Sequence, residues 1–237
     1  MKATRLLSLI AITLFCMLAS CSRPKYYTSA SFDQKTAKHK LVAVLPAEIV
    51  LTGNQPKNLT RADIEIIEEE ESKAFMQSLY NSILEYANTR KYYTRVNLQD
   101  FATTIKILGD NNITLRDSWN RNDEEMARLL GVDAVVRMRI RKTRYMSDMA
   151  SYGVDLAKRI SYETGVFGVA NRVGIPVPYI SNRTNDINAS CSLVSNGETL
   201  WNDYYKGGAN WNNPANQIIE GVTEIFGKHF PYKQRNR

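Results

Sequence analysis

Cysteine is scarce in this 237-residue chain, and two of the three cysteines, Cys16 and Cys21, stand within or just after the N-terminal apolar run. Cys191 is the one thiol of the remaining sequence. The chain after Cys21 therefore cannot form an intrachain disulfide, and its fold has to be stabilised by packing alone.

Histidine is rarer still, with His39 and His229 only. Neither stands near a cysteine, serine or acidic motif at the spacing of a catalytic triad or a zinc site. The stretch "KGGAN" lacks the lysine-serine or helix-opening context of a phosphate loop. We predict that the protein is not an enzyme and uses no cofactor and no metal. A carboxylate-dependent glycan hydrolase stays open as an alternative, because two acids brought together by folding leave no sequence trace.

Long hydrophobic runs are also lacking, except at the N-terminus. Lys2 and Arg5 precede an almost uncharged stretch over residues 6–19, which is typical of a secretory signal and too short for a comfortable membrane span. Its end, "LASC", resembles a bacterial lipobox, in which the cysteine is lipidated through its sulfur and becomes the first residue of the mature protein. The resemblance implies a signal peptide over 1–20 and lipidation of Cys21. An ordinary cleaved signal, or an N-terminal membrane anchor, is the alternative.

The residue after the cysteine bears on location. Ser22 follows Cys21, where an aspartate would resemble the inner-membrane retention signal of enteric bacteria, and no acidic cluster follows as in some surface-exported lipoproteins. The resemblance therefore points to the outer membrane, with the protein lipid-anchored and facing the periplasm.

Basic residues outnumber acidic residues only modestly. Without residues 1–20 the chain has 29 basic and 24 acidic residues, a net charge of about +5. This excess is compatible with an anionic envelope partner or lipid headgroups, and it is too small to indicate a nucleic-acid interface.

Hydrophobic patterning divides the mature chain into a flexible tether over 21–40 and one α/β domain over 41–233. The sheet is expected to be mixed or largely antiparallel, with helices packed on it. "KLVAVLP" predicts a buried strand that ends at Pro46, and residues 49–59 read as a loop. A long helix is expected from Thr60, which has capping-box spacing to Asp63. Residues 68–71, four glutamates in a row, are interpreted as a solvated segment of this helix, because consecutive helical residues point about 100° apart.

The middle of the chain contains two residues that are expected to cap helices. "KYYTRVN" predicts a short strand, after which Asn97 is expected to cap a helix. A second helix is expected from Asn122 to Gly131.

The segment "VDAVVRMRIRKTR" has the clearest strand periodicity. Alternation predicts that Ala134, Val136, Met138 and Ile140 share one sheet face, and that the arginine row of Arg137, Arg139 and Arg141 lies on the other. The row admits two interpretations. It is a surface for an acidic or anionic partner, or a solvated face with carboxylates such as Glu198 or Asp203 opposite.

Asn196-Gly197 between two strand-like runs is a strong hairpin signal, and Cys191 alternates onto its buried face. A last helix opens at Pro214, and the chain ends in a basic tail, "KQRNR". Between these parts, residues 145–186 form a Gly/Pro-rich insert without sustained periodicity. It is either an arm that docks on a partner or the membrane, or a connection packed on its own domain.

The order of these parts resembles a group of envelope lipoproteins that includes the curli-secretion lipoprotein CsgG and the penicillin-binding-protein activator LpoB. The resemblance is carried by Val44 to Pro46, by Gly131-Val132-Asp133 before a strand, and by Asn196-Gly197-Glu198 shortly before Trp201. It implies a fold similar to the N-terminal domain of TolB and no catalysis. The chain shows no clear pair of membrane-inserting β-hairpins, although residues 160–185 have room for one.

These features favour a non-catalytic outer-membrane lipoprotein that binds an envelope protein, as regulator or scaffold of a cell-wall or envelope assembly. The alternative is a self-assembling component of an outer-membrane secretion system, which would make the protein a homo-oligomer.

Overall fold

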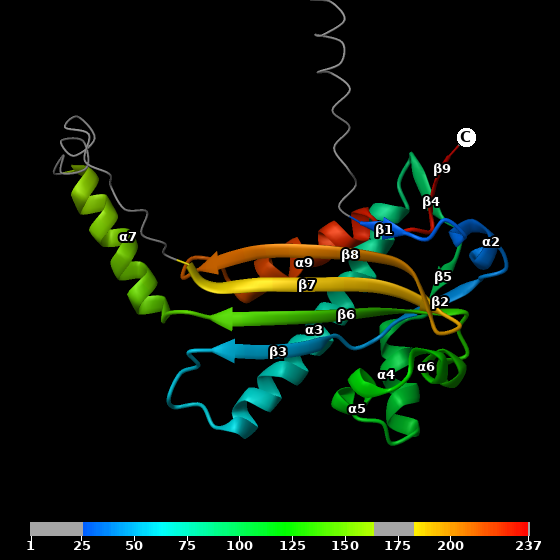
Figure 1. The fold of residues 1–237 in the computed structure, drawn as a ribbon, viewed down its shortest axis with the longest axis horizontal. Helices are drawn as coiled ribbons and strands as arrows, with labels where there is room; N and C mark the ends of the chain where they lie inside the picture. The colour runs from blue at the N-terminus through cyan, green and yellow to red at the C-terminus, as the bar shows by residue number, and fades with distance from the viewer. Residues whose placement is uncertain (1–25, 164–182, 237) are drawn as a thin grey trace, which may run out of the picture.

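The computed structural model describes residues 26–163 and 183–236 (Figure 1). The predicted signal peptide, Cys21 and residues 164–182 of the insert lie outside the described residues, as does most of the hypothetical hairpin over 160–185. Within the described part of the chain, no helix is long and apolar enough to cross a membrane.

Seven strands of the described chain form one mixed sheet, which confirms the predicted α/β class. In sheet order they are β1 (Tyr27–Thr28), β8 (Glu198–Asn210), β7 (Arg183–Ser195), β6 (Ala134–Arg144), β2 (Leu41–Val44) and β5 (Asn97–Leu98), with β3 (Glu48–Gly53) also on β6. The pairs from β6 to β1 are antiparallel, whereas β2, β3 and β5 run parallel to their neighbours. A second, two-stranded sheet pairs β4 (Tyr92–Thr94) with β9 (Lys233–Arg235).

Helices cover the two sheet faces unequally. One face packs along its length against α3 (Arg61–Ala87) and α9 (Ala215–Lys228), which lie behind the strands in Figure 1. Of the described helices, those on the other face cover it around β2 and the start of β6; they are α4 (Phe101–Asp110), α5 (Leu115–Asn120) and α6 (Asp123–Leu130). The remaining helices are α2 (Phe32–Thr36), beside β1, and α7 (Asp148–Glu163), which projects from the far end of the sheet.

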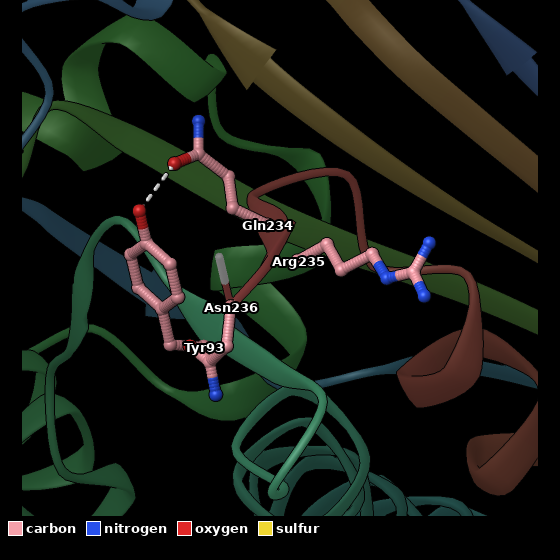
Figure 2. Close-up of a pocket in the computed structure, with 4 residues that line it drawn as sticks. All are labelled: Tyr93, Gln234, Arg235 and Asn236. Carbon is pink, nitrogen blue, oxygen red and sulfur yellow. Dashed lines mark hydrogen bonds between the residues drawn. The ribbon is translucent and has the colours of Figure 1, made fainter.

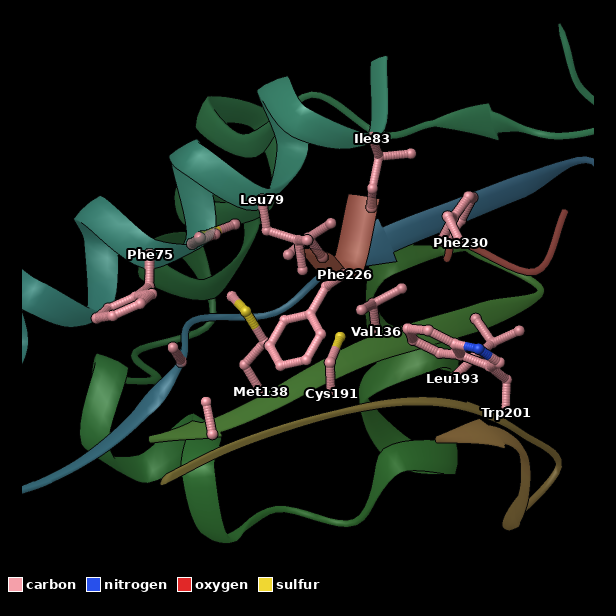
Figure 3. Packing of buried hydrophobic residues seen from close by; sticks show 14 of the residues in the cluster. Phe75, Leu79, Ile83, Val136, Met138, Cys191, Leu193, Trp201, Phe226 and Phe230 are labelled. Carbon is pink, nitrogen blue, oxygen red and sulfur yellow. The ribbon is translucent and has the colours of Figure 1, made fainter. Parts of the chain in front are cut away.

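The larger core fills the space between the sheet and the α3–α9 layer (Figure 3). Met138 of β6, Cys191 of β7 and Phe226 of α9 meet at its centre, and each is at most 1% exposed. The predicted alternation of β6 and the burial of Cys191 are therefore confirmed. A smaller core on the opposite face joins Val135 and Leu45 to α4 and α6.

A proline divides what would otherwise be one strand along β6. The amide of Leu45 still bonds to the carbonyl of Val136, but Pro46 has no N–H to continue the ladder. Pairing resumes at Glu48, so the loop predicted over 49–59 is wrong for the residues of β3.

The predicted caps and turns are mostly confirmed. Thr60 and Asp63 form a reciprocal capping box, and Asn122 caps α6. The hairpin turn has positive φ at both Asn196 (50°) and Gly197 (72°), the conformation that Asn-Gly favours. The prediction that Asn97 caps a helix is wrong. Asn97 belongs to strand β5 and pairs with Leu41 of β2, and Asp100 caps α4 instead.

Both predicted ends of the domain need correction. Residues 26–40, assigned to the tether, fold onto the domain: Tyr27 pairs with Asn202 of β8, and Phe32 is buried in the larger core. The C-terminal basic segment is not a free tail, because Lys233 to Arg235 pair with β4 as strand β9.

The interpretation of residues 68–71 as a solvated helix segment is wrong for two of the four glutamates. Glu68 lies 2.5 Å from the guanidinium of Arg116, and Glu71 lies 2.5 Å from the ammonium of Lys142. Glu68 also accepts the amide hydrogen of Leu51 on the outer edge of β3. The two side chains are three residues apart and so share one helix face, which turns them toward the sheet edge.

Candidate partner-binding face

Among the described residues, nothing beyond α4–α6 covers the sheet face opposite α3 and α9, and strand pairing aligns the side chains of this face in rows. One row consists of Arg141 on β6, Asn188 on β7 and Lys206 on β8. The next consists of Arg139, Ser190 and Tyr204. We call these six residues the open face. Because neighbouring strands are about 4.8 Å apart, the cations of the first row stand about 10 Å apart at their backbones.

Arg137 belongs to the arginine row but not to the open face. Its Nε donates to Asp123 Oδ1 at 2.6 Å, and its other nitrogens donate to the carbonyls of Ser118, Trp119 and Arg121. This one side chain, which is 16% exposed, makes four polar contacts to the α5–α6 segment. Arg137 therefore fastens α5 and α6 to the sheet, and the proposed surface is reduced to Arg139 and Arg141.

Arg139 is only partly neutralised. Its Nε donates to Glu48 Oε2 of the neighbouring strand β3 at 2.6 Å, and its side chain remains 64% exposed. The carboxylates that sequence reasoning placed opposite the row lie elsewhere: Glu198 pairs with Lys35, and Asp203 lies 2.8 Å from His229.

Arg141 and Lys206 are the unpaired cations of the open face. Both are exposed, and within the described ranges neither side chain has a hydrogen bond or an ion pair. Asp186, further along β7, is already engaged by Arg183 and Tyr145. Burial alone would raise the pKa of Asp186, but the hydrogen bonds from Arg183 and Tyr145 lower it below the usual range, so this carboxylate stays charged.

A shallow hollow of about 220 Å³ lies between the two rows. It is lined by Arg139, Arg141, Asn188, Ala189, Ser190 and Tyr204. The hydroxyl of Tyr204 donates to Asn188 Oδ1 at 2.9 Å, which fixes the ring across β7 and β8. The hollow thus presents guanidinium, amide and hydroxyl groups, a composition suited to carboxylate or other anionic groups.

The residues considered for catalysis lie apart from this hollow. Burial raises the pKa of the Cys191 thiol well above its usual value, and the side chain faces the core. Ser195 lies 3.4 Å from His39, but its hydroxyl donates to the carbonyl of Asp133 and is itself buried. In the described part of the chain, no three histidine, cysteine or acidic side chains gather as metal ligands would.

Sequence reasoning missed Asn188, Tyr204 and Lys206. The signal for Tyr204 and Lys206 was the alternation of β8, but the face that this alternation presents depends on an irregularity in the β7–β8 pairing between Leu193 and Val194. This irregularity, a β-bulge, shifts the pairing by one residue, and a shift of one exchanges the two faces of a strand.

Comparisons with known proteins give distant likenesses only. No family model and no curated protein matches the chain. Among solved structures, lipoprotein GNA1162 from Neisseria meningitidis is 14% identical, over 80% of this chain and 96% of that one, with a TM-score of 0.39. The LpoB C-terminal domain from Salmonella enterica is 11% identical, over 73% and 83%, with a TM-score of 0.36. A PelC dodecamer from Paraburkholderia phytofirmans is 8% identical, over 80% and 87%, with a TM-score of 0.36. Likenesses this distant assign no function.

Proposed function

We propose that the protein is a non-catalytic outer-membrane lipoprotein, anchored through Cys21 and facing the periplasm, that binds an envelope protein through the open face. It acts as a regulator or scaffold of a cell-wall or envelope assembly. One observation carries the binding part of this proposal: within the described part of the chain, Arg141 and Lys206 have no ion-pair partner and stand on a sheet face that no described element covers, on either side of Asn188.

The chemistry of the open face defines the partner. Exposed arginine and lysine beside a tyrosine and an asparagine are suited to a segment that carries carboxylates and backbone carbonyls. The sheet beneath them is rigid, because β6, β7 and β8 pair over most of their length and bury their opposite face. We therefore expect an acidic stretch of the partner to lie across the strands without a large rearrangement of this domain.

The anchoring part of the proposal rests on the "LASC" sequence and is tested separately. Globomycin inhibits the signal peptidase that processes bacterial lipoproteins, so it should cause the unprocessed precursor to accumulate. Intact mass measurement of the purified protein should show acyl chains on Cys21. Unchanged processing, or a mature protein without acyl chains, would contradict the anchor.

In-cell crosslinking of a tagged protein, followed by mass spectrometry, tests the binding part. An envelope protein should be captured by the wild type and lost with Arg141→Glu/Lys206→Glu, whereas Lys57→Glu, an exposed cation on the β3–α3 loop, should capture normally. Cys21→Ala is the mislocalised control. Capture of the protein itself together with secreted substrates would favour the secretion alternative. Release of soluble fragments from purified sacculi would favour the hydrolase.

A further inference from the structure

The chain between the predicted anchor and the folded domain is short. Tyr26 is the first described residue and follows Cys21 by five positions. Five residues span at most about 18 Å even when fully extended. If Cys21 is acylated, as the proposed function holds, the part of the domain around Tyr26 has to lie close to the lipid headgroups.

The small β4–β9 sheet stands at this same end of the molecule. The ring of Tyr26 packs on His229 with their centroids 4.9 Å apart, and His229 directly follows α9. The chain then continues into β9, which pairs with β4. In Figure 1, β1, β4 and β9 accordingly gather at one end, opposite α7.

Exposed cations lie just before β4 and on β9. Arg90, Lys91 and Arg235 have no carboxylate within ion-pair distance in the described ranges. Two nearby lysines differ from them: Lys228 pairs with Glu224, and Lys233 donates to the carbonyl of Lys228.

An aromatic side chain lies among these cations. Tyr93, 44% exposed, lines a hollow of about 680 Å³ with Gln234, Arg235 and Asn236 (Figure 2). The Tyr93 hydroxyl donates to Gln234 at 2.7 Å, and Arg235 extends away from this pair. Two more exposed tyrosines are Tyr26, just before β1, and Tyr27, the first residue of β1. Tyrosine is favoured at headgroup depth because its ring is apolar and its tip is polar.

We propose that this end of the domain lies on anionic phospholipid headgroups, with Arg90, Lys91 and Arg235 bound to phosphates and Tyr93 at the interface. The short chain to Cys21 brings the lipid surface within reach, and juxtamembrane cations bind anionic lipids additively. The open face extends along the sheet away from this end, so that it remains accessible to a protein in the periplasm.

Lysine labelling of the acylated protein tests this orientation. The full mature protein is reconstituted in vesicles of phosphatidylcholine, with or without phosphatidylglycerol, and treated with a water-soluble amine-reactive ester. Labelling of Lys91 should fall about fivefold when phosphatidylglycerol is present. A change of this size in the fraction of accessible lysine corresponds to the binding of roughly one cation to the anionic surface. Labelling of Lys57 should not change, because this lysine belongs to the β3–α3 loop, which lies at the opposite end of the sheet from β4 and β9 in Figure 1.

A charge variant distinguishes binding of these cations to lipid from a general loss of lysine labelling at the vesicle surface. Arg90→Gln/Arg235→Gln should restore labelling of Lys91 in the anionic vesicles, and the matched pair Arg61→Gln/Arg121→Gln should not. Equal labelling of Lys91 in both vesicle types, or restoration by the matched pair, would overturn the inference. The intact mass is measured on the same sample, so that a missing acyl chain, which would refute the anchor and this inference with it, is distinguished from an acylated protein that does not orient.

Discussion

Arg139 and Glu48 face each other across the parallel strands β6 and β3, and the guanidinium Nε lies 2.6 Å from the carboxylate Oε2. Glu48 therefore occupies the position on Arg139 that an acidic partner would take. Glu48→Gln should release Arg139 and increase capture of the envelope partner, up to about fivefold for an ion pair whose arginine is exposed. The yield in quantitative crosslinking measures this effect. Unchanged or lower capture would mean that Arg139 makes no contact with the partner.

Arg137 should behave differently from Arg141 although both lie on the same face of β6. Arg137→Ala removes the ion pair to Asp123 and leaves three backbone carbonyls without their donor. We expect a loss of about 2–4 kcal/mol in the free energy of unfolding. Arg141→Ala should cost at most about 0.5 kcal/mol, as a surface substitution. Urea unfolding of both variants checks this difference, and equal losses would contradict the structural role of Arg137.

Replacing only one partner of the ion pair between Lys142 and Glu71 should lower the stability of the fold. The two side chains are only 14% and 16% exposed, and the second carboxylate oxygen of Glu71 has no hydrogen-bond partner in the described chain. Lys142→Met should therefore destabilise the fold by about 2–3 kcal/mol, because it leaves a poorly solvated charge.

The double variant Lys142→Met/Glu71→Leu should recover most of that stability, since it leaves no unpaired charge. Lys106→Met, which breaks the exposed pair with Asp110, is the matched control and should cost at most about 0.5 kcal/mol. Thermal unfolding measures all three variants. A single variant no worse than this control would show that the pair contributes little.

His39 should make stability depend on pH. Burial, with a smaller contribution from Arg95, lowers the pKa of His39 below its ordinary value of 6.5, while Asp133 opposes the shift. The unfolded chain then binds the proton more readily than the folded one. This contribution to stability is present above about pH 6.5 and is lost as the pH falls toward the folded-state pKa.

His39→Gln should accordingly flatten the pH dependence of the unfolding free energy between pH 7.5 and about 5. His229→Gln serves as the comparison, because the chain has no other histidine. Parallel curves for wild type and His39→Gln would refute the assignment.

The sequence predicted the elements whose signal is local. The alternation of β6, the capping box of α3 and the Asn-Gly turn are all decided by residues close together in the chain. The burial of Glu68 and Glu71 could not be predicted in this way, because their partners Arg116 and Lys142 stand 48 and 71 residues further along. Strand β3 was missed because Pro46 is a strong break signal, whereas its pairing to β6 depends on residues far from it in the sequence.

The composition of the open face depended on one β-bulge. Had the pairing of Val194 with Thr199 continued unbroken, Asp203 would lie opposite Ser190, beside the arginines. The bulge places Tyr204 there instead and turns Asp203 into the core, where it is 1% exposed and bonds to His229. A single inserted residue thus removes a carboxylate from the face and leaves Lys206 beside Asn188.

Site-specific photocrosslinking in cells tests the central claim most directly. A photoreactive phenylalanine analogue is placed at Tyr204 on the open face, and in a control at Ile66, an exposed position on α3. We predict a discrete adduct with one envelope protein from position 204, absent from position 66 and abolished by Arg141→Glu/Lys206→Glu. No adduct from position 204, or the same adduct from both positions, would contradict binding through the open face.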